Sequence, residues 1–231
     1  MIENTFLDDR AQAADVEYIE KVLEFLCRGV VEIRCPGTTK GTISGYFDDI
    51  RNAAIIAADL SGRVPAVYIT LNPVDPRLLS RSVNRFKCYA KETTADKDII
   101  RRCWLPIDFD PVRPAGISST DQEHAAAIDR ARDCRIWLKY LGFPDAVLAD
   151  SGNGAHVLLP IDAPNDKDAA LLIDGCLKAI DQRFSDDIVR IDLSVFNAAR
   201  IWKLYGTLVC KGDSTPERPH RMAKILDGAD L

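Results

Sequence analysis

Leu148-Ala-Asp-Ser-Gly-Asn-Gly-Ala-His-Val-Leu-Leu-Pro-Ile161 is the stretch on which the fold depends. Two short apolar runs flank Ser-Gly-Asn-Gly, and apolar runs on either side of an Asn-Gly turn predict a tight β-hairpin. The small residues at positions 151–154 would leave backbone N–H groups exposed at the tip, where they suit an anion such as phosphate. His156 would emerge near the tip as a further donor. An ordinary hairpin with a packed histidine explains the same residues.

The segments around the hairpin alternate between helical and strand patterns. Apolar residues at helical spacing predict helices over 15–27, 46–60, 121–141 and 166–184, with a shorter one over 78–85. Runs rich in Val, Ile and Leu predict strands over 30–35, 66–71, 104–110 and 188–192, and a polar loop over 38–45. The chain is therefore expected to mix helices and sheets in packed layers.

Composition sets the broad class of the protein. A chain of 231 residues that is 47% hydrophobic can form one large domain or two small ones. No apolar run is long enough to span a membrane, and the first ten residues are too acidic for a signal peptide, so we expect a cytoplasmic protein. Seven scattered cysteines without a Cys-x-x-Cys pair predict reduced, mostly buried thiols.

Charge is distributed unevenly along the chain. The net charge of −5 predicts no general attraction to nucleic acid, but residues 77–102 are rich in Lys and Arg. Four-residue spacing would place Arg77, Arg81 and Arg85 on one face of a helix, where they could follow a phosphate backbone. A solvated helix surface explains this pattern equally well.

The strand predicted over 104–110 carries two carboxylates. Alternate residues of a strand share a face, so Asp108 and Asp110 would point the same way while Phe109 points into the core. Two such carboxylates are costly to hold together without a cation, and Mg²⁺ and Mn²⁺ prefer carboxylate oxygens. Two turn-promoting aspartates before a proline are the alternative.

A third carboxylate and two cations follow near the end of the chain. Asp192 ends the last predicted buried strand, and Arg200 and Lys203 come shortly after it. Clustered cations after a carboxylate suggest that metal and polyphosphate are handled together. Structural ion pairs with the acidic helix before them are the alternative reading of Arg200 and Lys203.

Taken in order, these motifs resemble a known family. An Asp-x-Asp strand, a Ser-Gly-x-Gly-x-His hairpin, a hydrophobic-Asp strand and an Arg-Ile-x-Lys-Leu-x-Gly-Thr segment are similar to those of the archaeo-eukaryotic primase superfamily. Within it, the chain resembles the primase-polymerases of plasmids, phages and CRISPR-associated loci. Lys203 stands where plasmid-type members often have Arg. The motifs span residues 104–207.

The resemblance implies an α+β fold, with an RRM-like β-sheet module packed beside an N-terminal α/β module. We therefore expect a single catalytic domain over 1–231, with the N-terminal module in 1–100 and the RRM-like catalytic module in 101–231. Family members often carry a helicase-like region further along. The resemblance thus implies that this chain is one domain of a longer protein or an excised catalytic fragment.

The resemblance also implies a nucleotidyltransferase, a DNA primase and DNA polymerase that uses two divalent ions, Mg or Mn. Its partners would be a single-stranded or primed DNA template and dNTP or NTP substrates, without a membrane. The catalytic, metal-binding residues would be Asp108, Asp110 and Asp192. The nucleotide-binding residues would be Ser151, Gly152, Asn153, Gly154, His156, Arg200 and Lys203. For Arg113 and Lys211 a structural role is the preferred expectation.

Other functional classes compete with this reading. A rolling-circle nuclease needs a His-hydrophobic-His pair, which the isolated histidines 124, 156 and 220 do not form. A nucleotidyl cyclase has no use for the Ser-Gly-Asn-Gly-Ala-His hairpin. A non-catalytic nucleotide- or DNA-binding replication-initiator module and a repair polymerase that only extends primers remain open. So do the preferred sugar of the nucleotide, the biological setting and the oligomeric state.

Overall fold

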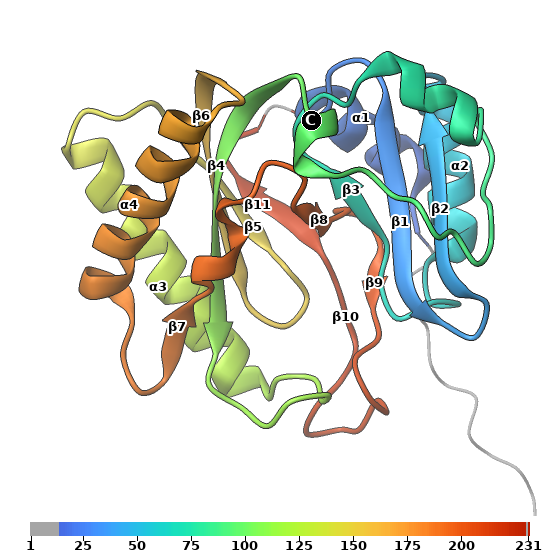
Figure 1. The fold of residues 1–231 in the computed structure, drawn as a ribbon. Helices are drawn as coiled ribbons and strands as arrows, with labels where there is room; N and C mark the ends of the chain where they lie inside the picture. The colour runs from blue at the N-terminus through green and yellow to red at the C-terminus, as the bar shows by residue number, and fades with distance from the viewer. Residues whose placement is uncertain (1–13, 230) are drawn as a thin grey trace, which may run out of the picture.

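The structure is a computed structural model that describes residues 14–229 and Leu231. The two larger of its three antiparallel sheets stand next to each other, and helices cover the outer side of each (Figure 1). In chain order, the described helices and strands are α1 Val16–Leu26, β1 Val31–Thr38, β2 Gly41–Phe47, α2 Ile50–Leu60, β3 Tyr68–Thr70, η1 Pro76–Arg81, η2 Asp96–Asp98, β4 Arg101–Pro111, α3 Asp121–Tyr140, β5 Val147–Asp150, β6 Ala155–Pro164, α4 Lys167–Phe184, β7 Val189–Ile191, η3 Leu193–Phe196, β8 Ile201–Lys203, β9 Leu208–Val209, β10 Arg221–Met222 and β11 Lys224–Asp227.

The first sheet has the strand order β2-β1-β3-β8. Its apolar face, which includes Ile33 and Ile69, is fully buried in the core that also takes in the apolar sides of α1 and α2. The opposite face is polar, because Arg34, Tyr68 and Lys203 are cross-strand partners and therefore point to the same side. This polar face is one wall of the candidate site.

One strand of this sheet differs from the sequence prediction. Residues 38–45 were expected to be a loop and 46–60 a helix, whereas Gly41–Phe47 is a strand and the helix begins only at Ile50. The helix begins there because Asp49 caps it by accepting from Asn52 N. The small polar residues of the strand lack the apolar pattern by which a strand is predicted from sequence. Its buried Ser44 is satisfied by Glu32 of the neighbouring strand, at 2.5 Å.

The second sheet has the strand order β11-β5-β6-β4-β7. Without the edge strand β11, its chain order is β4-α3-β5-β6-α4-β7, a βαββαβ unit in which β4 lies in the centre. This arrangement is the RRM-like module expected from the sequence. Helix α3 begins with the predicted capping box, because Thr120 accepts from Glu123 N and Glu123 accepts from Thr120 N.

The two sheets are not separated at a single point of the chain. Strand β8 lies within the segment expected to belong entirely to the catalytic module, yet it pairs with β3 in the first sheet. The division at residue 100 therefore does not hold for β8. Because β8 joins the first sheet, Lys203 lines the same cavity as the carboxylates of β4. Among residues 14–229 and Leu231, no helix combines the length and the apolar character needed to cross a membrane.

Candidate active site

A cavity of about 300 Å³ lies between the two sheets and gathers the three predicted carboxylates. Asp108 and Asp110 alternate with the fully buried Phe109 along β4, as the sequence predicts. Asp192 follows the neighbouring strand β7, and its backbone N–H donates to Asp108 O at 3.0 Å. The central position of β4 therefore brings carboxylates from distant parts of the chain to one cavity.

Asp108 is less solvated than Asp110, with 21% of its side chain exposed against 50%. Burial raises its pKa well above the usual value, and the negative charges of Asp110 and Asp192 raise it further. The positive charges of Lys203 and Arg200 oppose this rise. A cation that binds beside such a carboxylate removes the free-energy penalty on its charged form.

The carboxylates share a cavity but do not enclose an ion in the side-chain positions shown. Within the described part of the chain, no three His, Cys, Asp or Glu side chains form a group that could hold a metal. Asp192 Oδ1 instead accepts from Ser194 N at 2.8 Å and from Ser194 Oγ at 2.6 Å. The metal-binding role of Asp108, Asp110 and Asp192 therefore stays a prediction.

His156 is buried, with 3% of its surface exposed, and it is the cross-strand partner of Asp108. Its Nε2 lies 3.5 Å from Asp108 Oδ1, while its Nδ1 lies 3.0 Å from the hydroxyl of Tyr205. Its ring packs on Trp202, with centroids 4.0 Å apart. Burial, followed by the charge of Lys203, lowers the pKa of His156 well below its usual value, so the ring is neutral at pH 7. It lines the cavity from β6 as a buried side chain rather than projecting from an exposed hairpin tip.

The turn of the 148–161 hairpin is also more enclosed than the sequence predicts. Ser151 through Gly154 are all buried. Gly152 N donates to Asp150 Oδ1 at 2.7 Å, and Gly154 N donates to Ser151 Oγ at 3.0 Å. These two N–H groups are therefore occupied, which corrects the expectation of an exposed backbone cradle. The lining groups of this turn are Ser151 and Asn153.

The two glycines of the turn are required by space and backbone geometry. Gly152 has a φ of +86°, a conformation that other residues rarely adopt. A Cβ at Gly154 would lie 2.2 Å from Phe109 O on β4. Gly154 thus permits the close approach of β6 to β4, which places His156 beside Asp108.

Helix α3 holds the other side of this turn. His124 Nε2 lies 2.8 Å from Asp150 Oδ1, and both side chains are largely buried. Asn153 Oδ1 accepts from Ser119 N at 2.9 Å, just before the helix begins. His124 therefore fixes the hairpin from the first turn of α3.

Two predicted cations line the cavity with the carboxylates, Lys203 from β8 and Arg200 from the turn just before it. Lys203 lines the cavity from β8, with its Nζ 2.6 Å from the hydroxyl of Tyr68 and over the Tyr68 ring. Arg200 lines it as well and donates to Ser194 Oγ. The Nε of Arg200 is buried without a hydrogen-bond partner among the described residues. An unsatisfied buried donor of this kind is suited to an anionic ligand.

Arg113 and Lys211 line the same cavity, although the sequence favoured a structural role for both. Arg113, whose side chain is 5% exposed, places Nη1 3.6 Å from Asp110 Oδ1 and donates to Pro111 O. Burial and the neighbouring Arg113 lower the pKa of Lys211. Their signal in the sequence is weak, because each lies in an irregular segment without a periodic pattern.

The basic cluster proposed for a template is arranged differently from the prediction. The segment forms the short 3₁₀ helix η1, which ends at Arg81, so Arg85 lies beyond it. Arg77 is paired with Asp75 at 2.5 Å, whereas Arg81 turns inward and donates to Tyr46 Oη and Thr93 O. The three arginines therefore do not form one helical face.

Comparisons with known proteins give two structural neighbours. No protein-family model and no curated protein sequence matches the chain. The chain is similar to the crystal structure of primase RepB′, with 10% identity and a TM-score of 0.48, over 92% of this chain and 56% of that one. It is also similar to the polymerase domain of Mycobacterium tuberculosis ligase D in complex with DNA, with 16% identity and a TM-score of 0.48, over 90% and 79%.

The chain thus spans little more than half the length of the primase structure. Identities and TM-scores this low transfer neither an activity nor the role of any residue. The chemistry of the site has to come from the geometry of this chain.

Proposed function

We propose that this chain is a template-dependent nucleotidyltransferase, a DNA primase and polymerase that extends a primer 3′-OH or starts a new strand. The observation that supports it is the composition of one cavity. Asp108, Asp110 and Asp192 line one side, and the other lining groups include Arg113, Arg200, Lys203 and Lys211. A cavity that gathers three carboxylates together with several cations suits a reaction in which metal ions and a polyphosphate meet.

The three carboxylates are the proposed ligands of two divalent ions, Mg²⁺ or Mn²⁺. Carboxylate oxygens are the donors that both ions prefer. A bound cation would remove the penalty that burial and the neighbouring carboxylates place on the charged form of Asp108. Because Asp192 now accepts from Ser194, binding would require its side chain to turn. When bound, such ions lower the pKa of an attacking hydroxyl and stabilise charge on a leaving pyrophosphate.

The basic residues would bind the triphosphate of the incoming nucleotide. Arg200 has an unpartnered Nε for this purpose, and Lys203 is held in place by Tyr68. Ser151 and Asn153 would add a hydroxyl and an amide from the hairpin turn. His156 has a different proposed role from the one expected, since its Nε2 faces Asp108 and would orient that carboxylate.

The test is a synthesis assay on a single-stranded DNA template, with and without an annealed primer, using labelled dNTPs or NTPs and Mg²⁺ or Mn²⁺. Products without a primer establish priming, and products only with a primer identify an extension polymerase. Asp108→Ala should abolish synthesis. Asp162→Ala is the matched control, because Asp162 lies on β6 with 75% of its side chain exposed. Nucleotide or DNA binding without any product would instead identify a non-catalytic module.

A further inference from the structure

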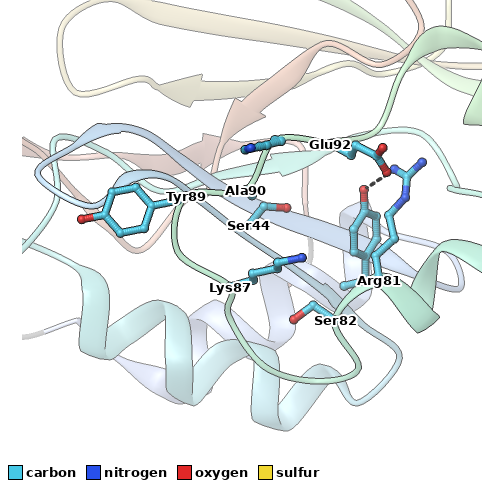
Figure 2. Close-up of a pocket in the computed structure, with 9 residues that line it drawn as sticks. Ser44, Arg81, Ser82, Lys87, Tyr89, Ala90 and Glu92 are labelled. Carbon is cyan, nitrogen blue, oxygen red and sulfur yellow. Dashed lines mark hydrogen bonds between the residues drawn. The ribbon is translucent and has the colours of Figure 1, made fainter.

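A second cavity, of about 440 Å³, lies at the β2 edge of the first sheet and shares no lining residue with the carboxylate cavity. The segment that follows η1 pairs with this edge, where Ser44 N donates to Lys87 O at 3.1 Å and Lys87 N donates to Ser44 O at 2.9 Å. In the view of Figure 2, Arg81 and Glu92 lie at one end of the cavity and Tyr89 at the other. A cavity of this volume can hold a group the size of one nucleotide.

Positive charge predominates around this cavity. Arg81, Lys87 and Lys91 line it, against the single carboxylate of Glu92. Arg81 is held in place, because it donates to Tyr46 Oη at 3.0 Å, whereas Lys87 and Lys91 are exposed. One fixed cation and two exposed ones on a protein of net charge −5 indicate a local site for an anion.

Tyr89 is held in an unusual conformation at the rim. Its φ is +52°, which is uncommon for a bulky residue, and 65% of its surface is exposed. Its N–H donates to Lys40 O at 3.0 Å, and its ring lies against Gly41, where a Cβ would come within 3.1 Å of Tyr89 Cδ1. An exposed aromatic ring that is fixed by a strained backbone is typical of a functional contact. Such a ring offers a surface on which a base can stack.

The cavity lies on the same face of the sheet as the proposed catalytic cavity. Lys203 pairs with Tyr68, Tyr68 pairs with Arg34, and Arg34 pairs with Ser44. Cross-strand partners point to one side, so this row leads from one cavity to the other over three inter-strand steps, or roughly 15 Å. A flexible strand of a few nucleotides can cover such a distance.

A buried carboxylate anchors the segment that lines the edge cavity. Glu32 accepts from Thr94 N at 3.0 Å and from Ser44 Oγ at 2.5 Å, and it is paired with Arg34. The segment that carries Lys91 and Glu92 is therefore anchored to the sheet rather than free to collapse into the cavity.

We propose that this edge cavity binds an unpaired nucleotide of the single-stranded DNA template, with its base on Tyr89 and its phosphate at Lys87 and Lys91. The identity of the strand as a template rests on the proposed function. The site itself rests on the cavity, its charge and the fixed aromatic ring. The path across the polar face favours a strand over a free nucleotide.

The test measures binding of a labelled single-stranded oligonucleotide of about 12 nucleotides, a length within the usual range for such sites. Fluorescence anisotropy is recorded without metal or free nucleotide. Tyr89→Ala should weaken binding roughly five- to 150-fold, the range expected for one stacked base, while Tyr89→Phe keeps wild-type affinity. Replacing Lys87 and Lys91 with Ala should reduce the slope of log affinity against log salt by about one. An oligonucleotide of abasic sites should remove the effect of Tyr89→Ala.

Tyr140→Ala and Lys224→Ala are the controls, since both residues are exposed and lie outside the cavity. Binding by Tyr89→Ala that equals binding by Tyr140→Ala would overturn the proposal. So would an effect of Tyr89→Ala that persists on the abasic strand. If binding depends on Tyr89 but the protein makes no product, the polymerase proposal is refuted and this inference stands. If the protein synthesises product but its binding does not depend on Tyr89, this inference is refuted and the polymerase proposal stands.

Discussion

Asp108 and His156 are direct partners across two neighbouring antiparallel strands, with His156 Nε2 3.5 Å from Asp108 Oδ1. A chain of hydrogen bonds decides which nitrogen of this neutral ring carries the proton. Trp202 Nε1 donates to Tyr205 Oη at 2.9 Å, so the hydroxyl of Tyr205 is left to donate to His156 Nδ1. We assign the proton to Nε2 on this basis, and it points at the carboxylate.

Tyr205→Phe should therefore disturb the site without removing any group that lines it. The change leaves the buried Trp202 Nε1 and His156 Nδ1 without a partner, at a cost of about 1–3 kcal/mol for each group in the free energy of unfolding. It also lets the proton move to Nδ1, which turns a lone pair toward Asp108. We expect the kcat of synthesis to fall roughly 10–100-fold, as for other residues that orient a metal ligand, with less effect on the KM for nucleotide.

Urea unfolding and steady-state primer extension measure the two effects of Tyr205→Phe separately. Tyr140→Phe, which removes the hydroxyl of a tyrosine that is 87% exposed, serves as the control and should change neither. A variant that is destabilised but keeps its full kcat would show that the hydrogen-bond chain serves stability alone.

Asp108→Asn should make the metal-free protein more stable while it abolishes synthesis. The wild-type carboxylate is buried beside Asp110 and Asp192, which disfavours its charge at neutral pH. A neutral amide of the same shape removes that penalty, and each 1 kcal/mol gained raises the Tm by about 2–4 °C in a chain of this size. Thermal unfolding with and without Mn²⁺ provides the measurement. Mn²⁺ should raise the Tm of the wild type and of Asp162→Asn but not that of Asp108→Asn, and an equal rise in all three would place the ion elsewhere.

Local signals in the sequence were sufficient for part of this site. The alternation of Asp108, Phe109 and Asp110 on a strand is a property of the backbone, and the capping box of α3 depends on residues three apart. The contacts that bury His156 depend on Tyr205, which is 49 positions away, and periodicity carries no information about them. Strand β2 was missed because its inward Ser44 is satisfied only by Glu32, a partner that becomes visible once the strands pair.

Glu32 should make stability depend on pH. Burial alone would raise its pKa, but the hydrogen bond and charge of Arg34 and the hydrogen bonds from Ser44 and Thr94 outweigh burial, so the pKa is lowered. The unfolded chain then binds more protons than the folded one in the pH window between the lowered folded pKa and about pH 4.5. The stabilisation is present above that value and is lost as the pH falls through the folded pKa.

Glu32→Gln tests this expectation. It should destabilise the protein at pH 7 by about 3–5 kcal/mol, because Arg34 loses its buried partner. It should also flatten the loss of stability between pH 5 and 3 that urea denaturation detects in the wild type. Glu24→Gln, on the exposed side of α1, is the matched control. A pH profile of Glu32→Gln that parallels the wild type would assign the acid sensitivity to another group.

Gly154 and Gly175 should respond in opposite ways to the same substitution. A Cβ at Gly154 would meet Phe109 O at 2.2 Å, so Gly154→Ala must push β6 away from β4, at a cost of about 3 kcal/mol. A Cβ at Gly175 meets nothing within 4 Å inside α4, so Gly175→Ala should stabilise the helix by about 0.5–1 kcal/mol.

The displacement at Gly154 also separates His156 from Asp108, and a shift of about 1 Å in a catalytic group can cost roughly 100-fold in rate. Synthesis by Gly154→Ala, measured at a temperature where the variant is fully folded, should fall by that order, while Gly175→Ala keeps wild-type activity. Full activity in folded Gly154→Ala would mean that the spacing of these two strands does not set the geometry of the site.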